Sequence, residues 1–267
     1  MAAVSLVVSD VDGTLVTSDK QLTPATLDAV RRLGQAGIAF TVASSRPPIG
    51  LAMLVEPLGL KLPMGAFNGS TVVSPDLTVV EEHLIPADAA REAVARLDRA
   101  GADVWVFADK QWILRDPAGP YTDRERRTLL HEPTVVADLA SCLDRASKIV
   151  GVSRDFALLA AQEAEIGAAL GEGASVHRSQ RYYLDVTPPG VDKGSLVDAL
   201  ARALGIGPEA IVTLGDMAND IALFRRSGFP IAMGNADEPV QRAARAVTRT
   251  NDEDGFAAAI DAYVLGG

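Results

Sequence analysis

Residues 4–15 read Val-Ser-Leu-Val-Val-Ser-Asp-Val-Asp-Gly-Thr-Leu, an apolar run that stops at two aspartates one residue apart. The run is typical of a buried strand. Side chains two positions apart on an extended chain point the same way, so Asp10 and Asp12 should leave the strand end on one side. Two close carboxylates stay ionised together only with positive charge between them, and Mg²⁺, which prefers oxygen ligands, fits there. Taken alone, the pair is also compatible with an ordinary solvated turn.

Strand and helix patterns alternate along both ends of the chain. Strands are predicted at residues 4–8, 38–43, 64–67, 211–214 and 230–233. Helices are predicted at residues 24–35, 48–58, 193–204, 217–227, 238–244 and 254–263. Thr23 is the expected N-cap of the first helix, with Pro24 at its first position. Such alternation is typical of a parallel sheet covered by helices, so the predicted fold class is α/β.

The middle of the chain has a different pattern. Hairpins are predicted around the turns at residues 74–76 and 108–111, and helices at residues 87–100 and 155–170. Extended segments are predicted at residues 146–152 and 182–186 and near Val176. We therefore predict an inserted α+β domain at residues 83–186, with a core formed by residues 1–82 and 187–267.

The string at residues 10–15, Asp-Val-Asp-Gly-Thr-Leu, resembles the first motif of the haloacid dehalogenase-like (HAD) superfamily. In that family the first aspartate is a nucleophile that forms an aspartyl-phosphate, and the second is the general acid and base. The resemblance implies these catalytic roles for Asp10 and Asp12. Carboxylate nucleophiles that form such intermediates are an established catalytic strategy.

Residues 43–46, Ala-Ser-Ser-Arg, follow the second predicted strand, at the sheet edge where open α/β sheets bind ligands. Hydroxyl groups, backbone N–H groups and a nearby helix N-terminus suit an anion, although a simple N-cap is the alternative. The segment resembles the family's second motif, which implies that Ser44 binds the phosphoryl group. Ser45 and Arg46 are further phosphate-binding candidates, and relatives usually have glycine where Ser45 stands.

Lys193 begins a predicted helix, and a cation is unfavourable at the N-terminus of a helix dipole. An anion beside the lysine would offset this cost. A lone lysine is otherwise most often a solvated surface group. This lysine matches the third motif of the family, whose lysine stabilises the nucleophilic carboxylate and the charge of the transferring phosphoryl group. The resemblance therefore implies that Lys193 is both catalytic and phosphate-binding.

Residues 215–220, Gly-Asp-Met-Ala-Asn-Asp, follow an apolar strand. Asp216, Asn219 and Asp220 have the spacing i, i+3 and i+4, which predicts one shared helix face. N-capping accounts for Asp216 but not for three polar groups turned the same way. The segment resembles the fourth motif of the family, which implies that Asp216 ligates Mg²⁺ and that Asn219 contacts phosphate. Asp220 would contact the direct ligands of the ion rather than the ion itself.

The four motifs together are similar to the type IIB, Cof-like branch, which implies a Rossmann-like core, a C2B-type cap and Mg²⁺ as cofactor. The ion would be held by the Asp10 carboxylate, the Asp12 backbone carbonyl and Asp216. The expected reaction is hydrolysis of a small phosphomonoester such as a sugar phosphate, so the expected partner is a small phosphorylated metabolite. A sugar phosphomutase stays open as an alternative, as does a non-catalytic, phosphate-dependent binding or regulatory protein. Neither the substrate nor the oligomeric state is specified by the motifs.

Composition excludes several other classes of function. The formal net charge of −10 argues against non-specific nucleic-acid binding, which depends on clustered Lys and Arg. The densest basic cluster, within residues 124–127, interleaves with Asp123 and Glu125, a pattern that indicates a solvated helix face. No apolar stretch reaches the ~18 residues of a membrane span, so no membrane association is expected. With one cysteine, Cys142, and no signal-peptide pattern, a cytoplasmic location is expected.

Overall fold

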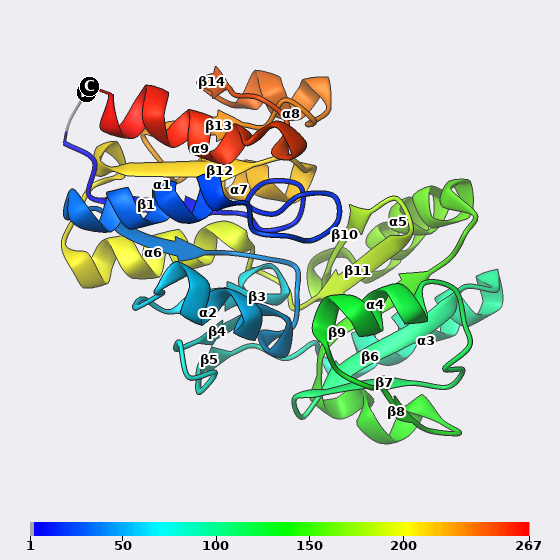
Figure 1. Cartoon of the computed structure of the whole chain (residues 1–267). Coiled ribbons are helices and arrows are strands. Elements are labelled where there is room, and N and C mark those ends of the chain that lie inside the picture. Colours follow the sequence, from blue (N-terminus) through cyan, green and yellow to red (C-terminus); the bar gives the residue numbers. More distant parts are fainter. Residues whose placement is uncertain (1–2, 267) are drawn as a thin grey trace. The chain divides into compact units, whose positions relative to one another are not determined.

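The computed structural model describes residues 3–266, which divide into two compact units. Within these residues, the first unit comprises 3–44, Leu51–Val80 and 192–266, and the second comprises Ser45–Gly50 and Glu81–Val191. The first unit contains the predicted parallel sheet and the second is a mixed α/β insert, so the predicted fold class is confirmed (Figure 1). The predicted domain boundaries at residues 83 and 186 stay a proposal.

Five parallel strands form the main sheet of the first unit, in the order β14-β13-β12-β1-β2 (Figure 1). They are β1 (Leu6–Ser9), β2 (Ala39–Val42), β12 (Ile211–Gly215), β13 (Phe229–Ala232) and β14 (Ala246–Val247). β1 pairs with β2 on one side and with β12 on the other, so that Leu6 lies opposite Ile211. The central strand therefore joins segments from opposite ends of the chain.

Helices cover both faces of this sheet. They are α1 (Pro24–Gln35), α2 (Ala52–Leu58), α6 (Lys193–Leu204), α7 (Ile221–Phe224), α8 (Glu238–Ala243) and α9 (Gly255–Ala259). Val7 packs in a cluster with residues of α1, α2 and α9, whereas Leu6 and Val8 pack with residues of α6, α7 and α8. Because β1 is buried on both faces, its sequence reads as a continuous apolar run rather than an alternating one.

The first helix begins as the sequence predicts. Thr23 is its N-cap, and the side-chain oxygen of Thr23 accepts the backbone N–H of Thr26 at 3.1 Å. Pro24 occupies the first turn, where its missing N–H group has no helical partner to lose. The capping prediction is therefore confirmed.

The helix predicted at residues 217–227 is wrong in extent. A short 3-10 turn precedes α7, which begins only at Ile221. The Asp220 carboxylate accepts the backbone N–H groups of Asp216 and Met217, both at 2.9 Å, and so holds this segment as a turn. The expected shared helix face is therefore not formed, and the polar side chains of the segment converge through a loop.

A three-stranded sheet, in the order β3-β4-β5, follows α2. Its strands are β3 (Met64–Ala66), β4 (Thr71–Val73) and β5 (Val79–Glu82). Between β3 and β4 the chain turns at Asn68 and Gly69, with φ angles of 59° and 90°. A Cβ on Gly69 would lie 2.2 Å from the backbone oxygen of Asp192, so glycine permits the turn to approach the start of α6.

The second unit is built on a six-stranded sheet, in the order β10-β11-β9-β6-β7-β8 (Figure 1). Its strands are β6 (Asp103–Ala108), β7 (Gln111–Leu114), β8 (Thr134–Val135), β9 (Ala146–Val152), β10 (Ser175–Gln180) and β11 (Tyr183–Thr187). Its helices are α3 (Ala87–Ala100), α4 (Thr122–Leu129) and α5 (Phe156–Leu170). Alternate strand residues such as Val104 and Val106 form a core with α3 and α5, and α4 lies where the charge pattern indicated a solvated helix.

Aromatic side chains of the second unit pack against one another. The ring centroids of Trp105 and Trp112 are 5.1 Å apart, and those of Trp105 and Tyr183 are 5.2 Å apart. Tyr121 stacks on Tyr182 at 4.4 Å. Both tryptophans are buried, so this cluster contributes to the unit's own core.

Within residues 3–266, no helix combines the length and the apolar character that crossing a membrane requires.

Candidate active site

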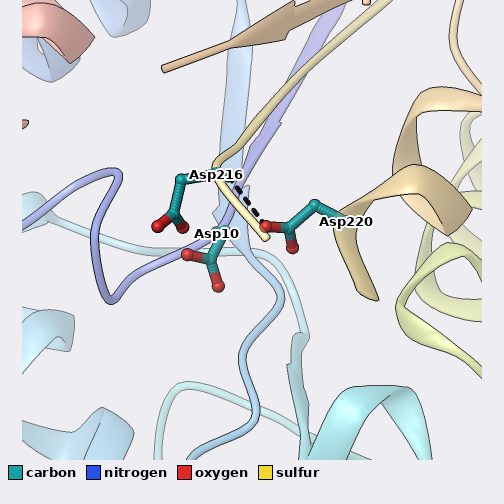
Figure 2. A group of neighbouring side chains, drawn as sticks. All are labelled: Asp10, Asp216 and Asp220. Atoms are coloured by element: carbon teal, nitrogen blue, oxygen red, sulfur yellow. Dashed lines mark hydrogen bonds between the residues drawn. The ribbon is translucent and has the colours of Figure 1, made fainter. Parts of the chain in front are cut away.

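Functional candidates of the first unit gather at one edge of the parallel sheet. Asp10 directly follows β1, Asp216 directly follows β12, and Ser44 comes soon after β2. Neighbouring parallel strands end at the same edge, where open α/β folds bind ligands. Figure 2 shows the carboxylates of Asp10, Asp216 and Asp220 turned toward one another there.

Lys193 places a buried positive charge between two of these carboxylates. Its Nζ atom lies 2.6 Å from Oδ1 of Asp10 and 2.6 Å from Oδ1 of Asp220. The lysine is 2% exposed, so both ion pairs are shielded from water. The sequence predicted that an anion lies beside this lysine at the helix start. The carboxylates of Asp10 and Asp220 provide that negative charge.

Asp220 organises the loop after β12 rather than projecting freely. Its Oδ1 accepts from Lys193, and its Oδ2 accepts the backbone N–H groups of Asp216 and Met217. Both oxygens of this carboxylate are therefore engaged by protein donors. This arrangement fixes the position of Asp216 and suits the supporting role expected for Asp220.

Asp216 is held by side chains from distant parts of the chain. Thr14 donates its hydroxyl to Oδ1 of Asp216 at 3.3 Å, and Asn235 donates from Nδ2 to Oδ2 at 3.3 Å. Gly13 has a φ of 88°, and a Cβ at this position would lie 2.2 Å from Oδ2 of Asp216. The glycine therefore leaves the space that the Asp216 carboxylate occupies.

Three buried carboxylates and one ammonium leave the cluster with excess negative charge. Burial raises the pKa of Asp10 to about 7, although the charge of Lys193 opposes the shift. Burial, with the charges of Asp10 and Asp220, raises the pKa of Asp216 to about 9. Burial alone would lower the pKa of Lys193, but the two neighbouring aspartates outweigh it and hold that pKa above its ordinary value. One more positive charge would relieve the cluster.

The residues present fit a small divalent cation. Carboxylate oxygens of Asp10, Asp216 and Asp220 lie within 4.8 Å of one another. Because protein donors already engage both oxygens of Asp220, Asp10 and Asp216 are the candidates for direct ligands. An all-oxygen donor set with excess negative charge is the kind that hard cations such as Mg²⁺ prefer. Because Gly13 has no Cβ, the Asp216 carboxylate can lie close to the other two carboxylates.

A Gly13→Ala variant tests this cradle. It is expected to lower the affinity for Mg²⁺ by at least about 10-fold, because the added Cβ displaces the Asp216 carboxylate. Gly37→Ala is the matched control, since Gly37 also has a positive φ, 75°, but its Cβ would meet nothing within 4 Å. Calorimetric titration of both variants with Mg²⁺ measures the difference. Equal loss in the two variants would show that backbone strain alone is responsible.

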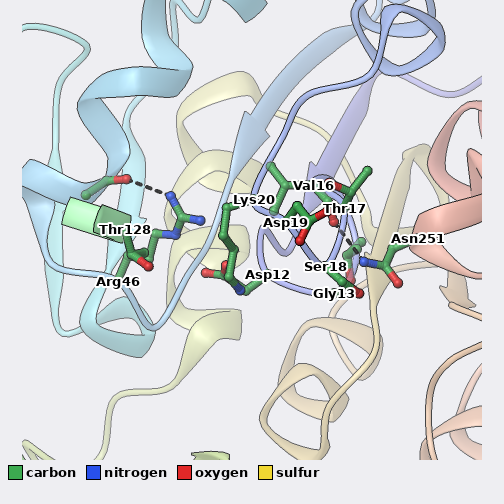
Figure 3. A network of polar contacts seen from close by, with 12 residues as sticks. Asp12, Gly13, Val16, Thr17, Ser18, Asp19, Lys20, Arg46, Thr128 and Asn251 are labelled. Carbon is green, nitrogen blue, oxygen red and sulfur yellow. Dashed lines mark hydrogen bonds and ion pairs between the residues drawn. The ribbon is translucent and has the colours of Figure 1, made fainter. Parts of the chain in front are cut away.

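Asp12 lies in the loop beyond β1 and has a partner of its own. The Nζ atom of Lys20 is 2.6 Å from Oδ1 of Asp12, and Figure 3 shows the two side chains together. Asp12 is less buried than Asp10, with 15% of its side chain exposed against 5%. The two aspartates of the first motif therefore have separate lysine partners, Lys193 for Asp10 and Lys20 for Asp12.

Ser44 and Asn219, both expected to contact phosphate, are linked through Asn68. The backbone N–H of Asn68 donates to the carbonyl of Ser44 at 2.9 Å, and Asn219 donates from Nδ2 to Oδ1 of Asn68 at 3.0 Å. Ser44 is buried, and its own N–H donates to the carbonyl of Gly65. These bonds fix both candidates near the sheet edge, while their role in binding phosphate stays a prediction.

Ser45 and Arg46 belong to the second unit. The carbonyl of Ser45 accepts from Nζ of Lys148 at 2.9 Å, and Arg46 donates from one terminal nitrogen to the carbonyl of Gly50 at 3.1 Å. Lys148 also pairs with buried Asp185 at 2.6 Å. The structure thus shows both residues in contacts of the loop and the insert, and phosphate binding by them stays a prediction.

Lys20 and Asn251 were missed by the sequence analysis, and Asn235 was given no role there. Asn235 donates to the carbonyl of Gly13 and accepts the backbone N–H of Asn251, which in turn donates to the carbonyl of Val16. Lys20 was missed because a lone lysine in a polar loop gives no periodic or motif signal. The turn at Asn235 and the one at Asn251 each look ordinary, and only their meeting in space reveals a role.

Comparison with known proteins identifies the family. A sequence profile described as haloacid dehalogenase-like hydrolase matches residues 7–260. Pyridoxal phosphate phosphatase YbhA of Escherichia coli is 27% identical over 266 residues, covering 96% of this chain and 97% of its own. A solved haloacid dehalogenase-like hydrolase from Bacteroides thetaiotaomicron is 27% identical, with a TM-score of 0.84 over 97% of this chain and 98% of that one. The HAD subclass IIB sugar phosphatase BT4131 shares the fold, with a TM-score of 0.82 and 24% identity over 96% of this chain and 98% of its own. The resemblance inferred from the four motifs is confirmed, and the chain belongs to the haloacid dehalogenase-like hydrolase family.

Proposed function

We propose that this protein is a phosphatase that hydrolyses a small phosphomonoester, such as a sugar phosphate, through an aspartyl-phosphate on Asp10. The observation that carries the proposal is the buried cluster in which Lys193 lies 2.6 Å from Asp10, beside Asp216 and Asp220. YbhA is named for pyridoxal phosphate and BT4131 for sugars, so both related proteins are named for small substrates. This supports a small phosphorylated metabolite as the substrate class.

In the first step, Asp10 attacks the phosphorus of the ester. Lys193 binds Oδ1 of Asp10, which orients the carboxylate so that Oδ2 is the attacking oxygen. As the bond from phosphorus to the leaving oxygen breaks, Asp12 donates a proton to that oxygen. Lys193, Ser44 and Asn219 bind the non-bridging oxygens, where preorganised donors act most strongly on the transition state.

In the second step, the Asp12 carboxylate takes a proton from water as the water oxygen attacks phosphorus. The bond from phosphorus to Asp10 breaks, which releases inorganic phosphate and restores the Asp10 carboxylate. Asp12 thus alternates between acid and base, and each role requires its carboxyl group near the reacting oxygen. The separate lysine partners of Asp10 and Asp12 suit this division of labour.

Mg²⁺ is the cofactor that this proposal includes. The Asp10 carboxylate, the Asp12 backbone carbonyl and Asp216 would hold it, with Asp220 fixing the loop of Asp216 through two backbone N–H groups. When bound, the ion supplies positive charge that reduces the repulsion between the nucleophile and an anionic phosphate.

Saturating Mg²⁺ is expected to raise the midpoint of thermal unfolding by roughly 5 °C. The gain should be larger at about pH 9 than at about pH 6, because protons and the cation compete for the same carboxylates. The pKa values of Asp10, about 7, and Asp216, about 9, lie above those of an unfolded chain. The stabilisation that their protons provide is therefore present in acid and is lost as pH rises through these values, where the ion replaces it.

Thermal melts with Mg²⁺ or a chelator across this pH range measure the effect. Asp216→Asn should lose most of the Mg²⁺-dependent gain, whereas Asp19→Asn, which changes an exposed carboxylate, should retain it. A gain that does not depend on pH, or that survives in Asp216→Asn, would contradict the assignment of these carboxylates to the metal.

The activity itself is tested by phosphate release from a panel of metabolite phosphomonoesters and one activated aryl phosphate. Mg²⁺-dependent release is expected, with loss on chelation. A phosphomutase would instead return the phosphoryl group to a second hydroxyl of a sugar phosphate, and a binding or regulatory protein would bind esters without turnover. Absence of release from every ester, in folded protein supplied with Mg²⁺, would overturn the proposal.

A further inference from the structure

Lys20 is a lysine of the candidate active site that none of the four motifs marks. Its Nζ atom lies 2.6 Å from Oδ1 of Asp12, with 22% of the lysine side chain and 15% of the aspartate side chain exposed. Exposed ion pairs contribute little, but partial burial lets such a pair hold one geometry. Lys20 is therefore placed to control how Asp12 is oriented (Figure 3).

The backbone of Lys20 adopts a conformation that a lysine does not favour. Its φ is 64°, in the left-handed region, which is unfavourable for most non-glycine residues. The N–H of Lys20 donates to the carbonyl of Thr17 at 2.8 Å, and the N–H of Thr17 donates to the carbonyl of Gln21 at 3.0 Å. Glycine would fit this turn without strain but would bring no ammonium group to Asp12.

Contacts from the last part of the chain hold this turn in place. Ser18 donates its backbone N–H and its hydroxyl to the carboxylate of Asp252, at 2.8 and 2.7 Å. Asn251 donates from Nδ2 to the carbonyl of Val16 at 2.9 Å. The backbone of the turn that carries Lys20 is therefore held by contacts other than the pair with Asp12.

We propose that Lys20 is a positioning residue that acts through Asp12, an inference that depends on the phosphatase function proposed above. Its ammonium orients the Asp12 carboxyl group toward the leaving oxygen. In the first step the Asp12 O–H bond breaks and the proton passes to that oxygen, which leaves a carboxylate beside the ammonium. In the second step the same carboxylate takes a proton from water. A charged hydrogen bond from Lys20 stabilises the carboxylate that exists between the two transfers.

The role makes a forecast that depends on the leaving group. A strongly basic alkoxide needs a proton as it departs, whereas dinitrophenolate departs readily without one. Loss of Asp12 orientation should therefore slow alkyl esters far more than an activated aryl ester. A variant that merely loosened the fold, or that lost a contact to the phosphoryl group, would slow both kinds of ester alike.

The test is the Lys20→Met variant of the full chain, supplied with Mg²⁺. Its kcat/KM, which reports the steps through departure of the leaving group, is expected to fall about 10- to 100-fold for alkyl phosphates. The fall for dinitrophenyl phosphate is expected to be less than about 3-fold. Equal falls for the two esters would overturn the proposal, as would no fall for either.

A double-mutant cycle identifies the group through which Lys20 acts. In an Asp12→Asn background, where the proton donor is already lost, Lys20→Met should cause no further loss. A loss of the same size in both backgrounds would show that Lys20 acts on the substrate or the phosphoryl group directly, and would overturn the inference. Lys20→Arg, which retains a cationic donor, should recover part of the alkyl ester activity.

Two further variants separate positioning from backbone effects. Lys20→Asn removes the charge but suits the left-handed conformation, so it should show the same leaving-group pattern without added strain. Asp19→Asn changes an exposed side chain of the same loop but leaves the Lys20–Asp12 pair, and both esters should react as in the parent. Failure of the proposed phosphatase function is distinguishable from failure of the Lys20 inference. In the first case the parent protein itself would release phosphate from neither ester.

Discussion

An Asp10→Asn variant is expected to release phosphate at least about 10³-fold more slowly than the parent while remaining folded. An amide is a poor nucleophile toward phosphorus and does not carry the charge that Lys193 pairs with at 2.6 Å. Burial raises the pKa of Asp10 to about 7, which means that the folded protein holds this carboxylate against its preference. The neutral amide should therefore leave the free energy of unfolding unchanged or raise it.

Single-turnover kinetics and a urea melt measure the two effects on the same preparation. The parent should pass through an acid-quenched protein carrying phosphate on Asp10, and the variant should form none. Asp19→Asn is the matched control, because Asp19 is an exposed carboxylate in the loop after β1. Phosphorylation of a folded Asp10→Asn protein at the parent's rate would exclude Asp10 as the nucleophile.

Lys193→Met is expected to be the most destabilising single change at this site, at about 3–5 kcal/mol. The ammonium is 2% exposed and lies 2.6 Å from both Asp10 and Asp220. Without it, two buried carboxylates face each other near Asp216 with no lysine charge between them. Activity should also fall by orders of magnitude, because the group that orients the nucleophile is gone.

Urea unfolding of Lys193→Met, with and without Asp220→Asn, separates the charge effect from lost packing. If uncompensated charge is responsible, adding Asp220→Asn should restore part of the stability lost in the single variant. Lys61→Met is the matched control, since Lys61 is exposed and its change should be nearly neutral. If the double variant instead lost more free energy of unfolding than the two single variants lose together, the charge explanation would fail. That result would argue that Asp220 is needed for its bonds to backbone N–H groups rather than for its charge.

The sequence predicted the fold well where local signals agree with packing. The strand before Asp10 is recognisable because it is buried on both faces, and α1 is recognisable from Thr23 and Pro24 at its start. The segment after β12 was misjudged because its spacing suits a helix, whereas the Asp220 carboxylate captures two backbone N–H groups. A side chain that competes for backbone donors is invisible to a periodicity argument.

In the candidate site, too, residues within local motifs were predicted, whereas residues that meet only in the folded chain were not. The resemblance to the family's motifs pointed to Asp10, Lys193 and Asp216, which the structure brings to one sheet edge. It did not identify Lys20, because a lysine gives no sequence signal for the left-handed backbone angle that it adopts beside Asp12. Distant partners such as Asn251, which bonds to Val16, likewise appear only after the chain has folded.

The position of β1 between β2 and β12 also constrains how the protein is made. As the chain emerges from the ribosome, β1 and β2 are available early, but β12 follows only after the whole second unit has been synthesised. Until then one edge of β1 lacks its hydrogen-bonding partner, and Leu6 and Val8 lack the helices that cover them. The second unit, in contrast, has nearly all of its chain in one stretch and can form its core first. Asp10, the proposed nucleophile, is therefore among the earliest residues translated and among the last to reach its folded environment. A truncated chain that ends before β12 would expose an unpaired strand edge, which favours aggregation, and would lack Asp216.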